Sequence, residues 1–349
     1  MPRASVKLDH TGTSRREHQL ILDLLSPFAD GENHDLASEL IQSSVNLLRD
    51  HAARVDVKLL NKAVKELRYA FKVFAPYRHL RKVSAFGSAR TGEASEEYRM
   101  AFDFGRKIRE QGFMVLTGAG SGIMEAVQRG AGRDGGFGLN IRLPMEQQAN
   151  STMKGDAKLI TFKYFFTRKL MFVKETSAIV CFPGGFGTMD ETFEALTLVQ
   201  TGKSYVIPVV LVQSPEDDYW QSWDAFIRRH MVDRGKISPE DTRLYRITES
   251  VDAAVDEVVC FYRVYHSMRY VGTSTVFRLN HAISESLVQQ LTEEFRDILN
   301  EGEFRLHPGP LPEETGDGEL ASLPRLVFPF NRQNMGRLRE IVDRINRAE

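Results

Sequence analysis

The feature that most constrains the fold of this chain is a unit that recurs between residues 81 and 266. Each unit is a short apolar run, a glycine-containing turn and a helical pattern, with turns such as FGSAR (86–90), TGAGSG (117–122) and PGGFGT (183–188). Runs such as VIPVVLV (206–212) are apolar without alternation, as are strands covered on both faces. The alternation predicts an α/β fold, a doubly wound, Rossmann-like parallel sheet with helices on both faces.

The two ends of the chain follow other patterns, so we expect three regions. Residues 1–80 carry leucines at helical spacing without a strand signal and predict a helical N-terminal segment. Residues 81–268 form the Rossmann-like domain. Residues 269–349 have the pattern strand, helix, strand, helix and predict a small C-terminal α/β module. In this interpretation, LYRIT (244–248) and the helical pattern 250–265 close the central domain.

Composition excludes several classes of protein. With 46 basic and 47 acidic residues the net charge is −1, so we expect neither nucleic acid nor a membrane as partner. No apolar run approaches the roughly 20 residues of a membrane span, and the first 20 residues lack a signal core, which predicts a cytoplasmic protein. Cys181 and Cys260 lie in apolar runs and are expected to be buried thiols; no metal and no cofactor is predicted.

The three glycine turns are candidates for a ligand site. Open α/β sheets bind ligands at the carboxyl ends of their strands, and helix N-termini there offer free N–H groups to anions. One such turn alone is typical of a tight connection, but three on one sheet edge favour a phosphate-binding crevice. TGAGSG has the spacing G-x-G-x-G rather than G-x-G-x-x-G, and the Lys and Ser/Thr of a P-loop are missing. NAD binding and ATP hydrolysis are therefore not the first choices.

Thr188 and Glu191 follow the PGGFGT turn and allow two interpretations. Their spacing fits a capping box, in which the Thr188 side chain caps the Glu191 N–H and Glu191 reaches back. Alternatively, Glu191 lies in the first turn of the helix and points into the ligand crevice. The spacing alone does not decide between a structural and a chemical role.

These stretches resemble a known family. PGGFGTMDE (183–191) matches the PGGxGTxxE motif of the LOG (lonely guy) family, whose members are often mislabelled as lysine decarboxylases. Arg168 and Lys169 in FFTRKLMF correspond to the Arg-Lys pair of that family, and GSGIMEAVQRGA (120–131) and AFGSAR (85–90) resemble its other turns. The resemblance covers roughly residues 80–265. The additional segments at both ends are similar to those of the longer bacterial nucleosidases of this superfamily.

The resemblance implies hydrolysis of the N-glycosidic bond of nucleoside 5′-monophosphates, AMP or a related nucleotide, to free base and ribose 5-phosphate. The transition state carries positive charge at C1′, which a carboxylate stabilises while it orients or deprotonates the attacking water. By resemblance, Glu191 has that role, and Arg168 holds the ribose hydroxyls or the phosphate and fixes the geometry of Glu191. The phosphate is expected on N–H groups of residues 184–188.

The remaining expectations concern the substrate. The predicted substrate-binding residues are Gly184, Gly185, Gly187, Thr188, Lys169, Gly120, Ser121, Gly122 and Ser88. Lys169 is expected to partner a phosphate or a carboxylate rather than act as a catalytic amine. Where plant members have Met-His-Glu or Met-His-Gln, this chain has Phe165, Phe166 and Thr167, which favours a general nucleotide nucleosidase over cytokinin preference. The two phenylalanines either stack on a base or pack in the core.

Two other functions remain open from the sequence. One is a non-catalytic nucleotide-binding or carrier protein on the same fold. The other is a pyridoxal-phosphate decarboxylase, which needs a buried Schiff-base lysine that no sequence feature singles out. A homodimer or higher homo-oligomer is expected, because the resemblance implies a site completed across a subunit interface.

Overall fold

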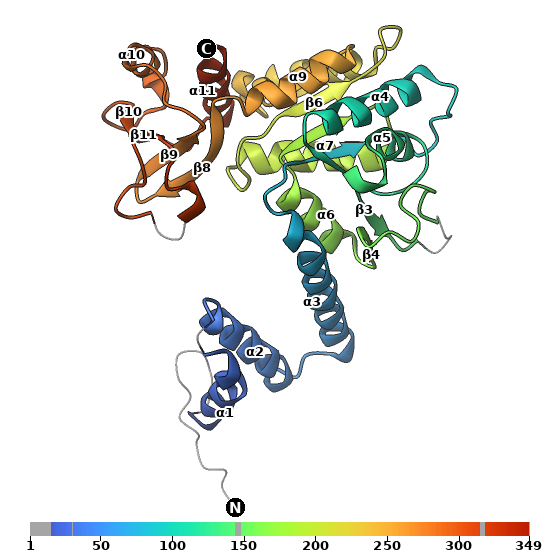
Figure 1. Ribbon diagram of the computed structural model, residues 1–349, viewed down its shortest axis with the longest axis vertical. Coiled ribbons are helices and arrows are strands. Elements are labelled where there is room, and N and C mark those ends of the chain that lie inside the picture. Colours follow the sequence, from blue (N-terminus) through green and yellow to red (C-terminus); the bar gives the residue numbers. More distant parts are fainter. Residues whose placement is uncertain (1–14, 30, 144–147, 315–317, 349) are drawn as a thin grey trace, which may run out of the picture. The chain divides into compact units, whose positions relative to one another are not determined.

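The computed structural model describes residues 15–348, except 30, 144–147 and 315–317. The chain divides into two compact units, Met1–Arg68 and Tyr69–Glu349, which are described separately. Figure 1 labels many of the elements of both. Short 3-10 and π turns connect some of them: η1 (Ser26–Phe28), η2 (Ala75–Tyr77), η3 (Arg133–Gly135), η4 (Arg228–Val232), η5 (Pro239–Leu244), η6 (Arg296–Ile298) and η7 (Gly318–Leu320).

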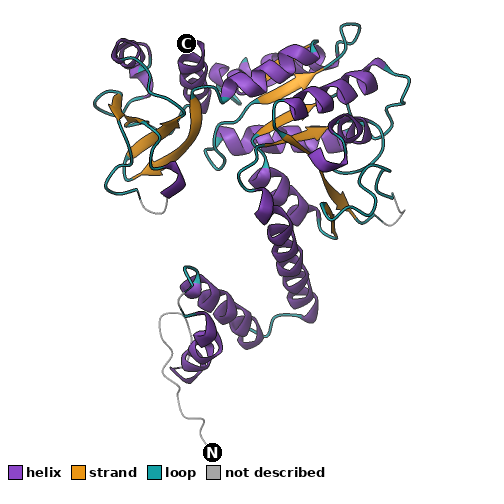
Figure 2. Ribbon diagram, in the orientation of Figure 1, coloured by secondary structure: helices purple, strands orange, loops and turns teal. Residues whose placement is uncertain are grey.

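The first unit is helical in its described residues (Figure 2). It contains α1 (Arg15–Leu25), α2 (His34–Arg49) and the first part of α3 (Arg54–Phe74), a helix that continues into the second unit. α1 contacts α2, and the ion pair between Arg49 and Glu17 joins them at 2.7 Å.

The second unit is built on a seven-stranded sheet with the order β4-β3-β2-β1-β5-β6-β7. Every neighbouring pair of strands is parallel. From β1 the chain adds strands in one direction as far as β4, and from β5 it adds them in the other. The order therefore reverses between β1 and β5, which confirms the doubly wound α/β fold and places the crevice for a ligand between those two strands. The strands are β1 (Lys82–Phe86), β2 (Met114–Thr117), β3 (Gly136–Ile141), β4 (Leu159–Phe162), β5 (Ala178–Cys181), β6 (Val209–Val212) and β7 (Arg246–Thr248).

Helices cover both faces of this sheet. On one face α4 (Glu96–Glu110), α5 (Ile123–Ala131) and α9 (Val251–Phe261) share a core with the strands (Figure 1). Because successive strand residues point to opposite faces, Phe86 of β1 and Cys181 of β5 face the other side. There they contact Phe172 of α6 (Phe165–Glu175) and Thr192 of α7 (Phe186–Gln200). α8 (Tyr219–Ile227) lies between β6 and β7 in the chain.

A second sheet follows the first, with four antiparallel strands in the order β10-β11-β9-β8. Its elements are β8 (Tyr265–Val271), β9 (Ser274–Leu279), α10 (Glu285–Glu294), β10 (Arg305–His307), β11 (Arg325–Phe328) and α11 (Met335–Arg347). The expectation of a helix over 250–265 was wrong at its end, because α9 stops at Phe261 and β8 begins four residues later. Pairing with β9 makes the residues from Tyr265 onward a strand.

The two cysteines differ. Cys181 is fully buried on β5, as expected, but Cys260 is exposed, so the prediction for Cys260 was wrong. α9 buries Val258 and Phe261 against the core, and Cys260 lies on its outward side. None of the helices described combines the length and apolar character needed to cross a membrane.

Candidate functional site

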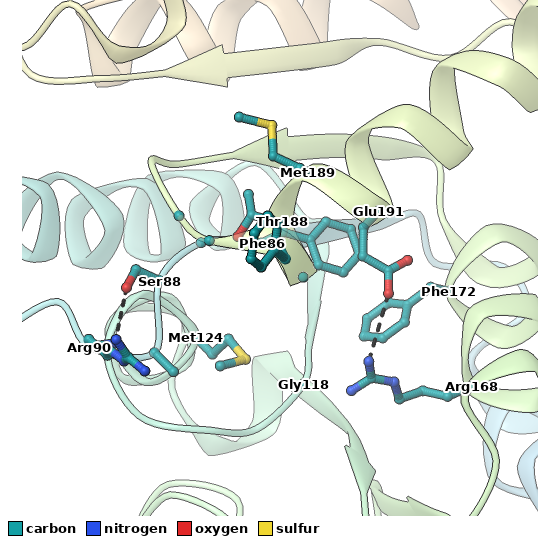
Figure 3. A pocket seen from close by; sticks show the side chains of 16 residues that line it. Phe86, Ser88, Arg90, Gly118, Met124, Arg168, Phe172, Thr188, Met189 and Glu191 are labelled. Atoms are coloured by element: carbon teal, nitrogen blue, oxygen red, sulfur yellow. Dashed lines mark hydrogen bonds and ion pairs between the residues drawn. The ribbon is translucent and has the colours of Figure 1, made fainter. Parts of the chain in front are cut away.

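A cavity of about 750 Å³ opens at the point where the strand order reverses (Figure 3). The turns after β1, β2 and β5 form one part of its wall together with the end of β1, and α5, α6 and α7 form the other part. It is lined by Phe86, Gly87, Ser88, Ala89, Arg90, Gly118, Met124, Arg168, Phe172, Gly184, Gly185, Phe186, Gly187, Thr188, Met189 and Glu191. Seven of the residues predicted for the site are therefore together here: Ser88, Arg168, Gly184, Gly185, Gly187, Thr188 and Glu191.

The turn after β5 leads directly into α7. Gly185, in an extended conformation, is the N-cap, and its carbonyl oxygen accepts hydrogen bonds from the N–H groups of Thr188 and Met189 at 3.0 and 3.1 Å. The N–H groups of Phe186 and Gly187 have no acceptor within the part of the chain that the structure describes. These two first-turn N–H groups are available to an anion, as at many helix N-termini.

The capping-box interpretation of Thr188 and Glu191 was wrong. α7 begins at Phe186, so Thr188 is the third helical residue, and the cap makes no side-chain hydrogen bond. Glu191 is the sixth residue and lies in the second turn, not in the first as expected. The PGGFGT turn is shorter than its glycines suggested, because Gly187 already belongs to the helix.

The turns after β1 and β5 are fastened together. The N–H of Ser88 donates to the carbonyl of Pro183 at 3.0 Å. A Cβ on Gly184 would lie 2.2 Å from Thr188 Oγ1 and 3.0 Å from the Ser88 nitrogen, so only glycine fits between the two turns. This close approach of two backbones forms the floor of the cavity.

The predicted residues Gly120, Ser121 and Gly122 are not among the described residues lining the cavity, but they support its wall. Ser121 Oγ donates to the carbonyl of Ala89 at 2.8 Å, and Gly120 accepts a hydrogen bond from Asn150 at 2.9 Å. Gly122 has φ +66°, and a Cβ there would lie 2.3 Å from the Ser88 oxygen. The turn after β2 therefore holds the Ser88 turn in place.

Glu191 and Arg168 form the charged side of the cavity. Glu191 is 7% exposed, and its Oε1 lies 3.7 Å from Nη2 of Arg168 (Figure 3). Arg168 is largely buried, with its guanidinium 5.0 Å from the centre of the Phe165 ring. Its Nε is buried and has no hydrogen-bond partner among the described residues. The side chain lines the cavity, and its Nη2 is the atom that contacts Glu191.

Burial changes the acidity of both groups. Removal from water raises the pKa of the Glu191 carboxyl, and the nearby charges of Lys169 and Arg168 counteract this only in part. Burial also lowers the pKa of Arg168, against the opposing effect of Glu191. A carboxyl with a raised pKa in a cavity is the usual condition of a group that transfers protons near neutral pH.

Lys169 lies behind this pair and is not among the described lining residues. Its ammonium contacts three carboxylates of α7: Glu194 at 2.6 Å, Asp190 at 2.9 Å and Glu191 at 3.3 Å. Burial tends to lower the pKa of Lys169, but hydrogen bonds with Glu194 and Asp190 outweigh it, and the pKa is raised. Lys169 was expected to partner either a phosphate or a carboxylate, and the contacts seen here are with carboxylates.

Phe165 and Phe166 do not pack in the core, since each is 51% exposed. Phe166 stacks on Tyr164, with ring centroids 5.5 Å apart. Neither phenylalanine is among the described residues that line the cavity. Stacking of either ring on a base stays a prediction.

Sequence reasoning missed Arg90. It lines the cavity, and its backbone N–H donates to Ser88 Oγ at 3.1 Å. The charged residues among the described lining are Arg90, Arg168 and Glu191, and Figure 3 shows Arg90 on the opposite side from the other two. Because Arg168 faces Glu191, Arg90 adds a positive charge that the cavity itself does not neutralise. Its position as the last residue of the first glycine turn was the available signal. Separately, no group of side chains suited to a metal ion occurs among the described residues.

The fold and cavity define a Rossmann-like α/β protein whose candidate ligand site lies at the switch point of the sheet. Comparison with known proteins identifies its family. A family model described as "Possible lysine decarboxylase" matches residues 124–258. An uncharacterized protein of Archaeoglobus fulgidus is 31% identical over 131 residues, 37% of this chain and 85% of that protein. The chain belongs to this family, the LOG family.

Two plant relatives are named for an activity. "Cytokinin riboside 5'-monophosphate phosphoribohydrolase LOG3" of Arabidopsis thaliana is 29% identical over 163 residues, 46% of this chain and 73% of the relative. "Probable cytokinin riboside 5'-monophosphate phosphoribohydrolase LOGL5" of Oryza sativa is 28% identical, over 47% of this chain and 65% of the relative. At the level of the family, these relatives support a phosphoribohydrolase.

Solved structures are more distant. A molybdenum cofactor binding protein from Rippkaea orientalis is 20% identical, covers 51% of this chain and 94% of its own, and has a TM-score of 0.37. The molybdenum cofactor carrier protein of Chlamydomonas reinhardtii is 24% identical, covers 52% and 98%, and has a TM-score of 0.35. The fold assignment depends on the strand order and pairing given above.

Proposed function

We propose that this protein hydrolyses the N-glycosidic bond of nucleoside 5′-monophosphates, releasing the base and ribose 5-phosphate. The observation that carries the proposal is the distribution of charge in the switch-point cavity. A buried carboxylate, Glu191, faces the cavity with Arg168, and the helix start of α7 and Arg90 offer positive charge away from that pair. A nucleoside monophosphate has the complementary layout, with an anion at one end and a developing cation at C1′.

In the proposed chemical step, Glu191 acts at the anomeric carbon. As the bond from C1′ to the base nitrogen breaks, its electron pair leaves with the base, and C1′ becomes oxocarbenium-like. An ionised Glu191 stabilises this charge in a site largely removed from water, where such interactions are strong. It also accepts a proton from the water that adds to C1′, and the departing base takes up a proton from solvent or a cavity group.

The phosphate is assigned to the opposite side. The N–H groups of Phe186 and Gly187, the Thr188 hydroxyl and the Arg90 guanidinium are the donors for it. Binding of this remote group holds the sugar in the geometry for attack, so that its binding energy contributes to rate. Arg168, which lines the cavity beside Glu191, then binds ribose oxygens and holds Glu191 in position.

The test is a product assay over a panel of purine and pyrimidine monophosphates, with the matching nucleosides as controls. We expect free base and ribose 5-phosphate in equal amounts from at least one monophosphate. A panel that stays intact would contradict the proposal. Nucleotide binding without hydrolysis would support the alternative, a non-catalytic nucleotide-binding or carrier protein.

A pyridoxal-phosphate decarboxylase, as the family description suggests, has less support. No lysine occurs among the described residues that line the cavity. The buried Lys82 lies elsewhere, at the start of β1, where its ammonium donates to the carbonyls of Tyr77 and Leu80 at 2.8 and 3.0 Å. Added pyridoxal phosphate is expected to give no absorption band of a lysine Schiff base.

A homodimer or higher homo-oligomer remains part of this proposal. Sedimentation of the whole chain measures it directly, with and without nucleotide. Localisation in the cytoplasm likewise stays a prediction.

A further inference from the structure

We propose that Lys169 is a positioning residue rather than a ligand of the substrate. Its positive charge balances the negative charge of Glu191 and is shared with Glu194. This inference rests on the proposed function of the cavity. It assigns different tasks to two neighbouring cations on α6, Arg168 and Lys169.

The contacts of Lys169 leave nothing for a substrate. An ammonium group has three N–H donors, and here three carboxylates of α7 surround it. The distances are 2.6 Å to Glu194, 2.9 Å to Asp190 and 3.3 Å to Glu191. The side chain is 16% exposed and does not line the cavity in its described part. Lys169 therefore ties α6 to α7 behind the cavity wall.

Each oxygen of Glu191 has its own cation. Arg168 Nη2 lies 3.7 Å from Oε1, and Lys169 Nζ lies 3.3 Å from Oε2. The two contacts come from adjacent residues of one helix, so they fix the rotation of the carboxylate about its final bond. A carboxylate held in this way keeps one oxygen directed to the cavity, which a catalytic carboxylate needs.

Glu194 competes with Glu191 for the same ammonium. Glu194 is closer to Lys169 than Glu191 is, by 2.6 against 3.3 Å, and lies one turn further along α7. The charged and titratable groups around Glu191 are Arg168 and Lys169 on α6, Asp190 and Glu194 on α7, and Cys181 on β5. Lys169 and Arg168 favour the ionised form of Glu191, while burial and Glu194 oppose it and raise its pKa. Lys169 and Glu194 thus have opposite effects on the pKa of Glu191.

The experiment measures the pH dependence of kcat/KM in four variants. Lys169→Met removes the charge at nearly constant volume, and we expect the acid limb to move to higher pH and kcat on the alkaline plateau to fall, because the carboxylate loses one of its two contacts. Glu194→Gln frees Lys169 for Glu191 and should move the limb to lower pH. Lys169→Arg keeps the charge and should largely restore the wild-type profile. Lys174→Met, on the exposed side of α6, is the control and should leave it unchanged.

A raised KM in Lys169→Met with an unmoved acid limb would overturn the inference, because it would mean contact with the substrate. Equal shifts in Lys169→Met and Lys174→Met would overturn it too. If Lys169→Met does not fold, the downward shift in Glu194→Gln still decides the question, and its absence contradicts the inference.

A second readout does not depend on hydrolysis. Carbon-13 NMR of labelled glutamate carboxyls follows the titration of Glu191 in the ligand-free protein, with Glu191→Gln identifying the signal. A titration that moves up in Lys169→Met supports the inference even if no nucleotide is hydrolysed, and in that case only the proposed function fails. An unmoved signal contradicts the inference whatever the activity.

Discussion

At the scale of single residues, the site depends on where charge is left unpaired. Arg168 faces Glu191 and Lys169 faces three carboxylates, so both cations are engaged within the protein. Arg90 is the charged lining residue whose side chain has no such partner among the described residues. The affinity for phosphate should therefore depend on Arg90 more than on the Arg-Lys pair.

We expect Arg90→Ala to raise KM for a nucleoside monophosphate by about 10- to 100-fold, with a small change in kcat. A hydrogen bond to a charged group is worth about 1.5–3 kcal/mol, which corresponds to that range. Initial rates with a monophosphate and with its nucleoside measure the effect. Arg99→Ala, on the exposed face of α4 and paired with Glu96, is the matched control. An equal loss with nucleoside and nucleotide would show that Arg90 does not bind the phosphate.

Glu191 should lower the stability of the protein at neutral pH. Because its pKa is raised by burial, the folded protein binds a proton at this carboxyl more tightly than the unfolded chain does. Its contribution to stability is present at low pH and is lost as the pH rises above the ordinary range of a glutamate through the folded pKa. Glu191→Gln removes this titration.

Thermal unfolding of Glu191→Gln should therefore occur at a higher temperature than that of the wild type at pH 7–8. The difference should shrink as the pH falls towards 4. Glu216→Gln changes an exposed carboxyl on a loop and serves as the control. A variant less stable than the wild type at pH 8 would mean that Lys169 and Arg168 outweigh burial.

At the scale of elements, much of the second unit was predictable, because its strands and helices differ in period and glycine punctuates them. The strand ends at Phe86, Thr117 and Cys181 lie close to where the sequence predicted them, as do the glycine turns after Phe86 and Thr117. β8 was not predicted, since its residues YHSMRYV show no clear apolar strand pattern and pairing with β9 specifies the strand. The start of α7 was also missed, because its glycines suggested a longer loop than the chain forms.

For the candidate site, sequence indicated which turns meet but not which residues point inward. Gly120, Ser121 and Gly122 belong to the correct turn, yet they hold the Ser88 turn rather than line the cavity in its described part. The role of Lys169 required the distances across α6 and α7. Neither fact has a local signal, since both arise from contacts between segments far apart in the chain.

The turn after β2 offers a test of this support. Gly122→Ala places a Cβ 2.3 Å from the Ser88 oxygen at φ +66°, and we expect a loss of at least about 1–3 kcal/mol in stability together with weaker nucleotide binding. Gly132→Ala is the matched control, with φ +73° and no atom within 4 Å of the new Cβ. Denaturant unfolding and nucleotide titration compare the two. Equal effects in the two variants would mean that the loss comes from the positive φ alone and not from contact with the Ser88 turn.

At the scale of the whole molecule, every described residue of the cavity belongs to the second unit. None of the described residues of the first unit is therefore among the groups assigned to the proposed chemistry. We expect a chain lacking residues 1–53, which keeps α3 whole, to retain kcat/KM for the preferred nucleotide within a few-fold. The same product assay measures it, and loss of activity in a chain that remains folded would show that the first unit contributes to catalysis.

The central claim is that one buried carboxylate acts on the anomeric carbon of an anchored nucleotide. The most direct measurement is a single-turnover assay of Glu191→Gln with the preferred monophosphate, combined with its binding affinity. We predict that hydrolysis falls by at least about 10²- to 10⁴-fold, the range for loss of general acid–base catalysis, while the dissociation constant changes little. Hydrolysis at the wild-type rate in this variant would contradict the account.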